Sequence, residues 1–383
     1  MAPSATRDDD LETISSPSKG LKLPDNAVQR LLKSGIDPKT YPTRPQKPEF
    51  LDQVYAIRSE YREHIDPGTR ADPEKKALFG AATKVVHLTA HIGTELHGLQ
   101  LAELSDKQKD ELALLIAERS VVFFRTPQSL TPQQQKSLGE YFGEVEIHPQ
   151  VAQVPGVPGV TVMWPDLQAK DFGRKVDFRN PGGASRWHTD LVHEAQPAGI
   201  THLHNDTVPE IGGDTLWSSG YGAYDKLSLA FREFLDGKTA IYRSAHTYID
   251  RDNPSVGPKF VEREHPLVRV HPATGWKSLW VNRAMTVRIV GLEKGESDVI
   301  LNYLYDIYER NVDIQVRFRW TNGASALWDN RITQHIASWD YEGNEPRHGT
   351  RVTSLAEKPI SVKDAASRGL GGKTRREALG LDK

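Results

Sequence analysis

The stretch Trp187-His188-Thr189-Asp190 decides how the rest of this chain is interpreted. His188 and Asp190 are separated by one neighbour, so on a strand both side chains would point to the same face. A second imidazole, His335, follows after enough residues for several strands. Two histidines and one carboxylate on one face form a known ligand set for non-haem Fe(II), which leaves the opposite coordination positions open. The sequence therefore predicts a facial metal site on a β scaffold.

Two arginines downstream of His335 provide cationic partners for anions. Arg347 and Arg351 are four residues apart, and this even spacing would place both on one face of a strand. A guanidinium offers a planar, bidentate fork to a carboxylate. Two cations in one pocket require anions nearby, so the pattern predicts a dicarboxylate co-substrate together with a second anionic group.

Two capping boxes predict helices in the first half of the chain. Ser105 with Gln108 begins a helix that is expected to end near Arg119, and the leucines within it give it an apolar face. Thr131 begins a second helix, with proline at the first helical position, which is expected to stop near Gly143. Helices are expected at two more places, near 221–236 and 296–310.

The remaining pattern consists of short strands separated by Gly and Pro, with few helices between them. It favours a mainly β fold with flanking helices, namely a double-stranded β-helix or jelly roll. The polar segment 160–186 directly precedes the metal triplet and is expected to form a mobile loop at the mouth of the site. Strands are expected at 85–88, 121–125, 316–320, 324–329 and 351–355.

Composition divides the chain into four parts. The prolines between residues 20 and 48 indicate an extended arm, and residues 50–64 have the apolar spacing of a helix. The segment after Ser361 is rich in Gly, Lys and Arg, and it is expected to be loose or to pack on a neighbouring subunit. The predicted parts are a disordered tail at 1–20, an N-terminal extension at 21–81, a jelly-roll domain at 82–356 and a C-terminal tail at 357–383.

Bulk composition argues against several classes of protein. The net charge of −2 gives no basic surplus, so neither nucleic acid nor a membrane is expected as a partner. The chain contains no cysteine, which excludes disulfides, thiolate nucleophiles and cysteine-based zinc or Fe–S sites. The lack of cysteine fits a cytoplasmic location. The sequence contains no apolar run that is long enough to predict a membrane-spanning helix. Composition leaves the oligomeric state open, with a homodimer or homotetramer as alternatives.

Several strings between residues 82 and 356 match one known family. They are Trp187-His188-Thr189-Asp190, Gly212-Gly213-Asp214-Thr215-Leu216-Trp217, Trp328-Asp329-Asn330-Arg331 with Gln334-His335, Phe124-Arg125 with Thr131-Pro132-Gln133-Gln134-Gln135, and Gly143-Glu144 with Ile147-His148-Pro149. With these strings the chain resembles the taurine/α-ketoglutarate dioxygenases. Its long N-terminal region is most similar to the fungal sulfonate dioxygenase branch of that family.

The resemblance implies roles for the residues of the metal and co-substrate site. His188, Asp190 and His335 match the ligands of Fe(II). Thr215 matches a threonine that holds one end of α-ketoglutarate, and Arg347 matches the arginine that pairs with the far carboxylate of the same molecule. The third participant of this chemistry is O2, which is a co-substrate as well.

The substrate side of the family pattern is matched less completely. His148 and Arg351 match positions that hold a sulfo group. Taurine-specific members carry a tyrosine where this chain has Val151 and an asparagine where it has Ala184. Because those polar side chains line the amine end of taurine, their replacement predicts a more apolar substrate pocket.

The resemblance therefore implies an oxidoreductase of sulfur metabolism. It would use Fe(II), α-ketoglutarate and O2 to hydroxylate the carbon next to the sulfo group of a small sulfonate or alkyl sulfate ester, releasing sulfite or sulfate and an aldehyde. Two alternatives stay open at this point: the same cofactor chemistry on another small anion, such as an aryloxyalkanoate or a purine, and a metal-binding jelly roll without turnover. A zinc hydrolase fits less well, because no general base is placed and both arginines would be unexplained.

Overall fold

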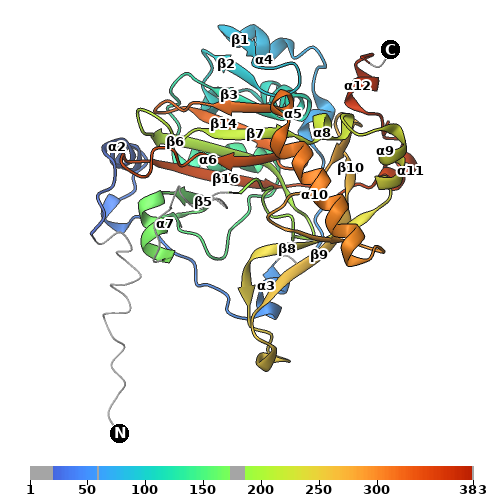
Figure 1. Cartoon of the computed structure of the whole chain (residues 1–383). Helices are drawn as coiled ribbons and strands as arrows, with labels where there is room; N and C mark the ends of the chain where they lie inside the picture. The colour runs from blue at the N-terminus through green and yellow to red at the C-terminus, as the bar shows by residue number, and fades with distance from the viewer. Residues whose placement is uncertain (1–19, 58–59, 173–185, 382–383) are drawn as a thin grey trace.

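The computed structural model describes residues 20–57, 60–172 and 186–381, and two β-sheets form its centre (Figure 1). The larger sheet has the strand order β1 (Lys84–His87), β2 (Thr94–His97), β3 (Val121–Phe124), β14 (Ser325–Asp329), β6 (Ala198–Thr207), β16 (His348–Leu355), β5 (Val157–Met163) and β4 (Gln153–Val154). The smaller sheet has the order β13 (Gln315–Phe318), β7 (Thr215–Ser219) and β15 (Thr333–Ala337). All neighbouring strands in these two sheets are antiparallel except the pair β2 and β3.

Aromatic side chains from both sheets fill the space between them. Phe123 on β3 stacks on Phe318 of β13 with 4.1 Å between ring centroids, and Trp217 on β7 meets Phe123 edge-on at 5.2 Å. All three side chains are buried. In a jelly roll the inner faces of two mainly antiparallel sheets share one core in this way. The predicted fold class is therefore confirmed.

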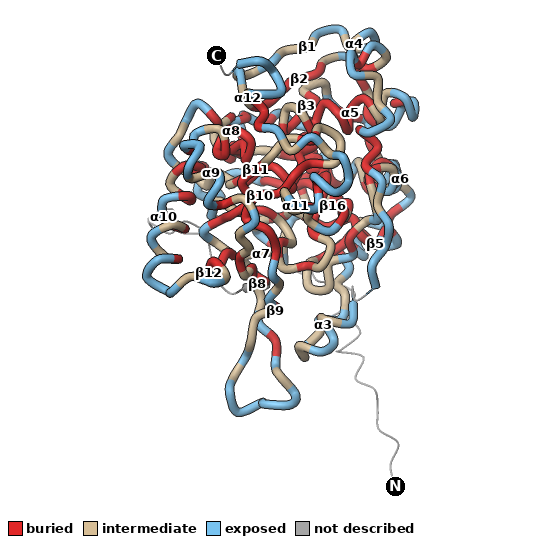
Figure 2. The backbone as a smooth tube through the Cα atoms, turned by 90° about the vertical axis from the view of Figure 1, so that its right-hand side faces the viewer, coloured by how far each residue is buried: buried red, intermediate tan, exposed pale blue. Residues whose placement is uncertain are grey.

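A second β unit stands beside the jelly roll. It contains the sheet β12 (Thr286–Ile289), β8 (Thr239–Tyr248) and β9 (Lys259–Pro266), and the pair β10 (Val268–Val270) and β11 (Lys277–Leu279). β8 and β9 form a hairpin that projects from the body of the molecule and has an exposed tip (Figure 2). Helix α3 (Leu51–Ile57) packs against this hairpin.

The helices predicted from the two capping boxes are present. α5 (Asp106–Arg119) begins after Ser105, whose hydroxyl accepts a hydrogen bond from the backbone N–H of Gln108. α6 (Pro132–Phe142) begins after Thr131 in the same way and ends before Gly143. The strands predicted at five places are β1, β3, β13, β14 and β16, with small shifts at their ends. These predictions succeed because each depends on local residues alone.

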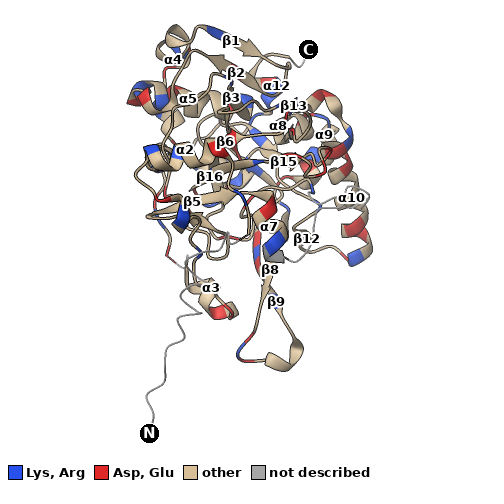
Figure 3. Ribbon diagram, turned by 90° about the vertical axis from the view of Figure 1, so that its left-hand side faces the viewer, with Lys and Arg blue, Asp and Glu red and all other residues tan. Residues whose placement is uncertain are grey.

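The other described helices surround the sheets (Figure 1). The helix predicted near 296–310 is α10 (Lys294–Arg310), whereas the one predicted near 221–236 is divided into α8 (Gly220–Asp225) and α9 (Leu229–Leu235). Acidic and basic residues are interspersed along α10 (Figure 3). None of the described helices combines the length and apolar character that crossing a membrane requires. The remaining α-helices are α2 (Asp25–Lys33), α4 (Lys76–Ala81), α7 (Pro165–Phe172), α11 (Val362–Ser367) and α12 (Arg375–Ala378), and short 3-10 helices lie at Pro38–Thr40, Pro67–Arg70, Leu101–Glu103, Pro254–Val256 and Val312–Ile314.

The N-terminal extension is more regular than its prolines suggest. The predicted extended arm at 20–48 contains helix α2, so that prediction is wrong for this part of the arm. The helix forms because Ala27 and Leu31 are one turn apart and bury the same face. The helix predicted at 50–64 is α3, but it already ends at Ile57.

Two further predictions of irregular structure are wrong in part. Residues 160–172 of the expected mobile loop belong mainly to β5 and α7, whereas 173–185 lie outside the described residues. The expected loose C-terminal segment forms α11 and α12, and it is attached to the body where Ser361 forms a β-bridge with Arg269 and where α12 packs on α8. Of the predicted disordered tail, residues 1–19 lie outside the described part of the chain.

A group of buried charges joins four segments of the chain. The Arg331 guanidinium lies 2.6 Å from a carboxylate oxygen of both Asp329 and Asp66, and 3.0 Å from one of Glu357. Arg269 pairs with the second oxygen of Glu357 at 2.8 Å. Burial would raise the pKa of Glu357, but the charges of Arg331 and Arg269 outweigh burial and lower this pKa to about 2. The Glu357 carboxylate is therefore ionised and depends on the two arginines.

Removing the central cation of this network should destabilise the fold strongly. We expect Arg331→Leu to lower the free energy of unfolding by about 3–5 kcal/mol, because buried carboxylates are left without their partner. The matched control is Arg283→Leu, since Arg283 pairs with Asp306 and Glu309 at the surface and its side chain is 42% exposed. That control should lose less than about 1 kcal/mol. Urea unfolding at neutral pH measures both values, and equal losses would contradict a stabilising role of the buried network.

Candidate active site

The three predicted metal ligands meet where a loop joins the edge of the smaller sheet. His335 lies on β15, and its backbone N–H donates to the carbonyl of His188 at 2.9 Å. The N–H of His188 donates in return to the carbonyl of His335 at 3.1 Å. This exchange pair sets the two residues opposite each other in an isolated β-bridge, with 4.2 Å between their ring centroids. The chain turns directly after Asp190, at Leu191, a non-glycine residue with a φ of 53°.

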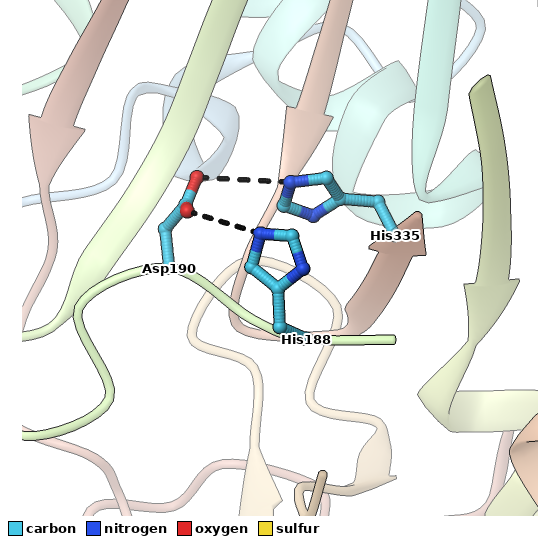
Figure 4. Close-up of side chains that lie close together, drawn as sticks. All are labelled: His188, Asp190 and His335. Carbon is cyan, nitrogen blue, oxygen red and sulfur yellow. Dashed lines mark ion pairs between the residues drawn. The ribbon is translucent and has the colours of Figure 1, made fainter. Parts of the chain in front are cut away.

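The triplet therefore does not lie on a regular strand as predicted, but its side chains still converge with His335 (Figure 4). His188 Nε2 lies 3.7 Å from one carboxylate oxygen of Asp190, and His335 Nε2 lies 3.9 Å from the other. One ligand atom from each residue lies within 4.8 Å of the other two. Within the described part of the chain, neither Nε2 atom has a hydrogen bond, so each keeps a lone pair for a metal. This donor set fits Fe(II).

Electrostatics keep two of the three side chains in the form that binds a metal. Burial alone would raise the pKa of Asp190, but the charge of Arg351 and the nearby histidines lower it to about 2. Burial, together with the neighbouring His188, lowers the pKa of His335 to about 3. At neutral pH the carboxylate is therefore ionised and the His335 imidazole is neutral, as metal coordination requires.

Hydrogen bonds behind His188 and Asp190 fix the orientation of these two ligands, whereas Nδ1 of His335 has no hydrogen-bond partner among the described residues. The Nδ1 atom of His188 lies 2.7 Å from the carbonyl oxygen of Arg186, so an Nδ1–H donor there directs Nε2 toward the metal position. The backbone N–H of Asp190 donates to the side-chain carbonyl of Asn330 at 3.2 Å. The amide nitrogen of Asn330 donates to the carbonyl of Gly199 on β6 at 2.9 Å. The turn between β14 and β15 therefore ties the loop with the triplet to the larger sheet.

One cavity, of about 180 Å³, opens from the ligands toward a buried arginine. His188, His335, Thr215, Arg347 and Arg351 all contribute to its wall. Arg347 is 9% exposed, and no carboxylate of the described residues lies within ion-pairing distance of its guanidinium. A guanidinium stays charged in proteins, and Tyr341 and the more distant Asp214 and Asp340 offset its burial only in part, because the pKa of Arg347 is still lowered by burial. The cavity therefore suits an anion that reaches from the metal to Arg347.

Thr215 supplies a further donor for such an anion. Thr215 Oγ1 accepts a hydrogen bond from the indole N–H of Trp320 at 3.0 Å, which leaves the hydroxyl hydrogen free to donate.

Arg347 lies directly before β16, and the register is irregular between His348 and Gly349. The predicted placement of both arginines on one strand face is therefore wrong, although Arg347 and the strand residue Arg351 share this cavity.

A second cavity, of about 290 Å³, begins at His188 and Asp190 on the other side of the metal position. The predicted substrate residues His148, Val151 and Arg351 line it. The Nη1 atom of Arg351 lies 3.3 and 3.4 Å from the two carboxylate oxygens of Asp190, a contact that the sequence pattern did not predict. Arg351 therefore stands between the two cavities and can serve an anion in the second one.

The sequence also missed several residues of the second cavity. Val54, Tyr248 and Met285 line it, but each comes from a segment with no recognisable site motif. His246 lines it too, although it is not part of the metal-ligand group. The fourth predicted substrate residue, Ala184, lies outside the described residues.

Comparisons with known proteins agree with this geometry. Residues 84–353 match the model of the family described as taurine catabolism dioxygenase TauD, TfdA family. An alpha-ketoglutarate-dependent sulfonate dioxygenase of Saccharomyces cerevisiae is 35% identical, over 84% of this chain and 81% of its own length. An alpha-ketoglutarate-dependent sulfate ester dioxygenase of Pseudomonas putida is 30% identical, over 76% of this chain and 97% of its own. The crystal structure of a taurine dioxygenase from Burkholderia xenovorans has a TM-score of 0.62 and 34% identity, covering 73% of this chain and 91% of that one.

A jelly roll with a His-Asp-His centre and a buried arginine defines a metal-dependent oxygenase with a dicarboxylate co-substrate. The chain belongs to the TauD/TfdA family of α-ketoglutarate-dependent dioxygenases, enzymes that use Fe(II), α-ketoglutarate and O2. The predicted similarity to the fungal sulfonate dioxygenases is confirmed by the yeast relative, and the alternative without turnover is set aside. The roles of individual residues stay predictions.

Loss of any one ligand should remove the metal. We expect His188→Ala, Asp190→Ala and His335→Ala each to weaken Fe(II) binding by more than about 100-fold, since removing even an outer hydrogen-bond partner costs about 10- to 100-fold. The matched control is His193→Ala, because His193 lines the second cavity but is not in the ligand group. Anaerobic titration with Fe(II), followed by calorimetry, measures the affinity. Unchanged binding in any of the three ligand variants would refute the assignment.

Proposed function

We propose that this dioxygenase hydroxylates the carbon next to the sulfo group of a small sulfonate or alkyl sulfate ester. The observation that carries the proposal is the second cavity, where Arg351 and His148 lie with the apolar side chain of Val151. A guanidinium and an imidazole suit an anionic head group, and apolar walls suit a hydrocarbon chain. The relatives named for sulfonates and for sulfate esters support the same class of substrate.

The residues of the first cavity prepare the oxidant. His188, Asp190 and His335 would hold the iron, and Arg347 with Thr215 would fix α-ketoglutarate beside it. Iron with α-ketoglutarate and O2 supplies the oxidation of a C–H bond. The protein contributes orientation, because the fixed carboxylate at Arg347 allows one direction of approach to the metal.

The residues of the second cavity would determine which C–H bond of the substrate lies next to the metal. Arg351 and His148 would hold the sulfo group, which places the adjacent carbon toward the metal between His188 and Asp190. Hydroxylation of that carbon gives an unstable product, which releases sulfite from a sulfonate or sulfate from an ester and leaves an aldehyde. Composition further predicts a cytoplasmic enzyme without nucleic-acid or membrane partners, with a homodimer or a homotetramer as the alternatives for its assembly.

The two arginines should separate in their kinetic effects. We expect Arg347→Ala to raise the KM for α-ketoglutarate about 30- to several-thousand-fold, because losing one partner of a buried charge pair costs roughly 2–5 kcal/mol. Arg347→Lys should be intermediate, since an ammonium keeps the charge without the planar fork. Succinate formation at varied α-ketoglutarate measures this. An unchanged KM would mean that the far carboxylate binds elsewhere.

Arg351→Ala should instead raise the KM for the sulfur substrate much more than the KM for α-ketoglutarate. Decarboxylation of α-ketoglutarate without primary substrate should partly survive. His148→Ala should show the same asymmetry more weakly, because an imidazole carries less charge than a guanidinium at neutral pH. Since Arg351 contacts Asp190, the iron content of each variant serves as the control. A larger effect on the α-ketoglutarate KM would mean that the two arginines have exchanged roles.

The enzyme should prefer a substrate with an alkyl chain over a substrate with an ammonium group. Each enclosed methylene contributes about 0.8 kcal/mol, so four additional carbons favour hexyl sulfate over taurine by roughly 3 kcal/mol in kcat/KM if they are fully enclosed. Val151→Tyr, which introduces the residue of taurine-specific members, should reduce this preference. The assay measures sulfite, sulfate and succinate for taurine, pentanesulfonate and hexyl sulfate, with an aryloxyalkanoate and a purine in the same panel. Faster turnover of taurine would refute the apolar-pocket argument, and turnover of only the last two would refute the substrate class.

A further inference from the structure

The second cavity extends beyond the part of the chain that matches the family. The match begins at residue 84, but Val54 of helix α3 contributes to the cavity wall. The same cavity is lined by His188 and Asp190 at the metal position. It therefore runs from the reacting centre to the N-terminal extension, and a substrate that fills it meets a residue outside the matched domain.

Backbone hydrogen bonds hold this wall in place. The N–H of Leu51 donates to the carbonyl of Ile249 at 2.9 Å, and the N–H of Ile249 donates to the carbonyl of Glu49 at 2.9 Å. These bonds attach the start of α3 to the end of β8, and Figure 1 shows the helix beside the hairpin. Val54 can therefore act as a fixed part of the cavity, because its helix is anchored to a strand that also lines it.

Three buried side chains form the interior of this attachment. Val54 is 8% exposed, Tyr248 is 5% exposed and Val261 is 2% exposed, and they pack in one apolar cluster. Val54 and Tyr248 face the cavity as well, whereas Val261 is not among the residues that line it. The cluster thus contains two residues that line the cavity, Val54 and Tyr248. It also contains a second valine, Val261, that does not line it.

Tyr248 also connects the wall to the loop that carries the head-group site. The Nε2 atom of Gln150 donates to the Tyr248 hydroxyl at 2.8 Å. Gln150 lies between His148 and Val151, both of which line the cavity. This hydrogen bond therefore ties the Tyr248 side chain to the loop that carries His148, while Val54 lines the same cavity from helix α3.

Polar and apolar groups share this surface: His246 of the same strand lines the cavity, as do His193 and Glu194. The hydroxyl of Ser244 donates to the carbonyl of His246 at 2.6 Å, so its hydrogen is used within the strand. Met285 adds a flexible apolar side chain to the cavity wall. The cavity thus has a cationic end with Arg351 and a wall that offers apolar contacts, which is the distribution that an amphiphilic anion requires.

We propose that Val54 and Tyr248 form the end wall that limits the length of the substrate's alkyl tail. The inference rests on the proposed function, because Arg351 must hold the sulfo group at the other end for the tail to point at this wall. Chain length is then selected by the distance from the anion site to Val54. The N-terminal extension consequently determines specificity, although it lies outside the family match.

The test compares wild type with Val54→Ala and Val54→Phe across linear sulfonates from ethanesulfonate to decanesulfonate. Binding is measured by calorimetry on the protein with α-ketoglutarate and Mn(II), and turnover by sulfite release with Fe(II). Each enclosed methylene changes affinity about fourfold. Val54→Ala, which opens space for about two carbons, should move the optimum to longer chains, with a gain on the order of tenfold there. Val54→Phe should weaken the best wild-type chain more than tenfold and favour shorter ones.

Val261→Ala is the matched control, because it makes the same deletion in the same cluster without altering the cavity. It should lower stability by a similar amount and leave the chain-length profile unchanged. If wild type and both Val54 variants show the same chain-length profile and still release sulfite, the proposed role of Val54 and Tyr248 as the end wall would be overturned, and the proposed function would not. Shifted binding profiles without sulfite release would support the wall, and they would overturn the proposed function if the matching alkyl sulfates release no sulfate either. No binding of any chain to wild type would overturn both.

Discussion

The reciprocal hydrogen bonds between the backbones of His188 and His335 set the spacing on which the metal centre depends. An exchange pair of this kind fixes two Cα atoms opposite each other, and side chains at opposed positions project to the same side. The two imidazoles are therefore brought together by the backbone, before any metal is considered. Because β15 pairs with β7 at its other edge, this arrangement requires the smaller sheet to be formed. Asp190 then needs only the turn at Leu191 to complete the ligand set.

Charges of both signs surround the two cavities. Fe(II), Arg347 and Arg351 would supply positive charge, against Asp190 at the metal position, Glu194 in the wall of the second cavity, and Asp214 and Asp340 at longer range from Arg347. A dicarboxylate in the first cavity and a sulfo group in the second would each bring negative charge to one of the two arginines. Buried charges are tolerated when they are paired, so each anion would stabilise the arginine that it meets. The contact of Arg351 with Asp190 gives that arginine a partner when the second cavity is empty.

Predictions from the sequence are right where neighbouring residues determine the structure. They are wrong or missing where contacts between distant segments determine it. The capping residues Ser105 and Thr131 signal their helices locally, and both helices are present. The pair His188 and Asp190, taken with His335 and the downstream arginine, predicted three side chains that the structure brings together, but it did not reveal that a single β-bridge replaces a strand. Val54 carried no signal, because its place in the cavity depends on how α3 attaches to the hairpin. The α11 and α12 helices were missed because their Gly- and Lys-rich sequence is ordered by packing on the body.

Both segments that flank the matched domain contribute charges to its interior. Arg331, in the turn that supports Asp190, is paired with Asp66 of the extension and with Glu357 beyond the match. On the other side of the larger sheet, Arg30 of α2 donates to the hydroxyl of Thr350 at 2.7 Å, next to Arg351. A fragment of residues 82–356 would leave Arg331 without two of its carboxylates and would remove Arg30 from β16. The boundaries predicted from composition mark changes in the sequence. The buried ion pairs that cross them argue that the flanking segments and the dioxygenase core fold as one unit.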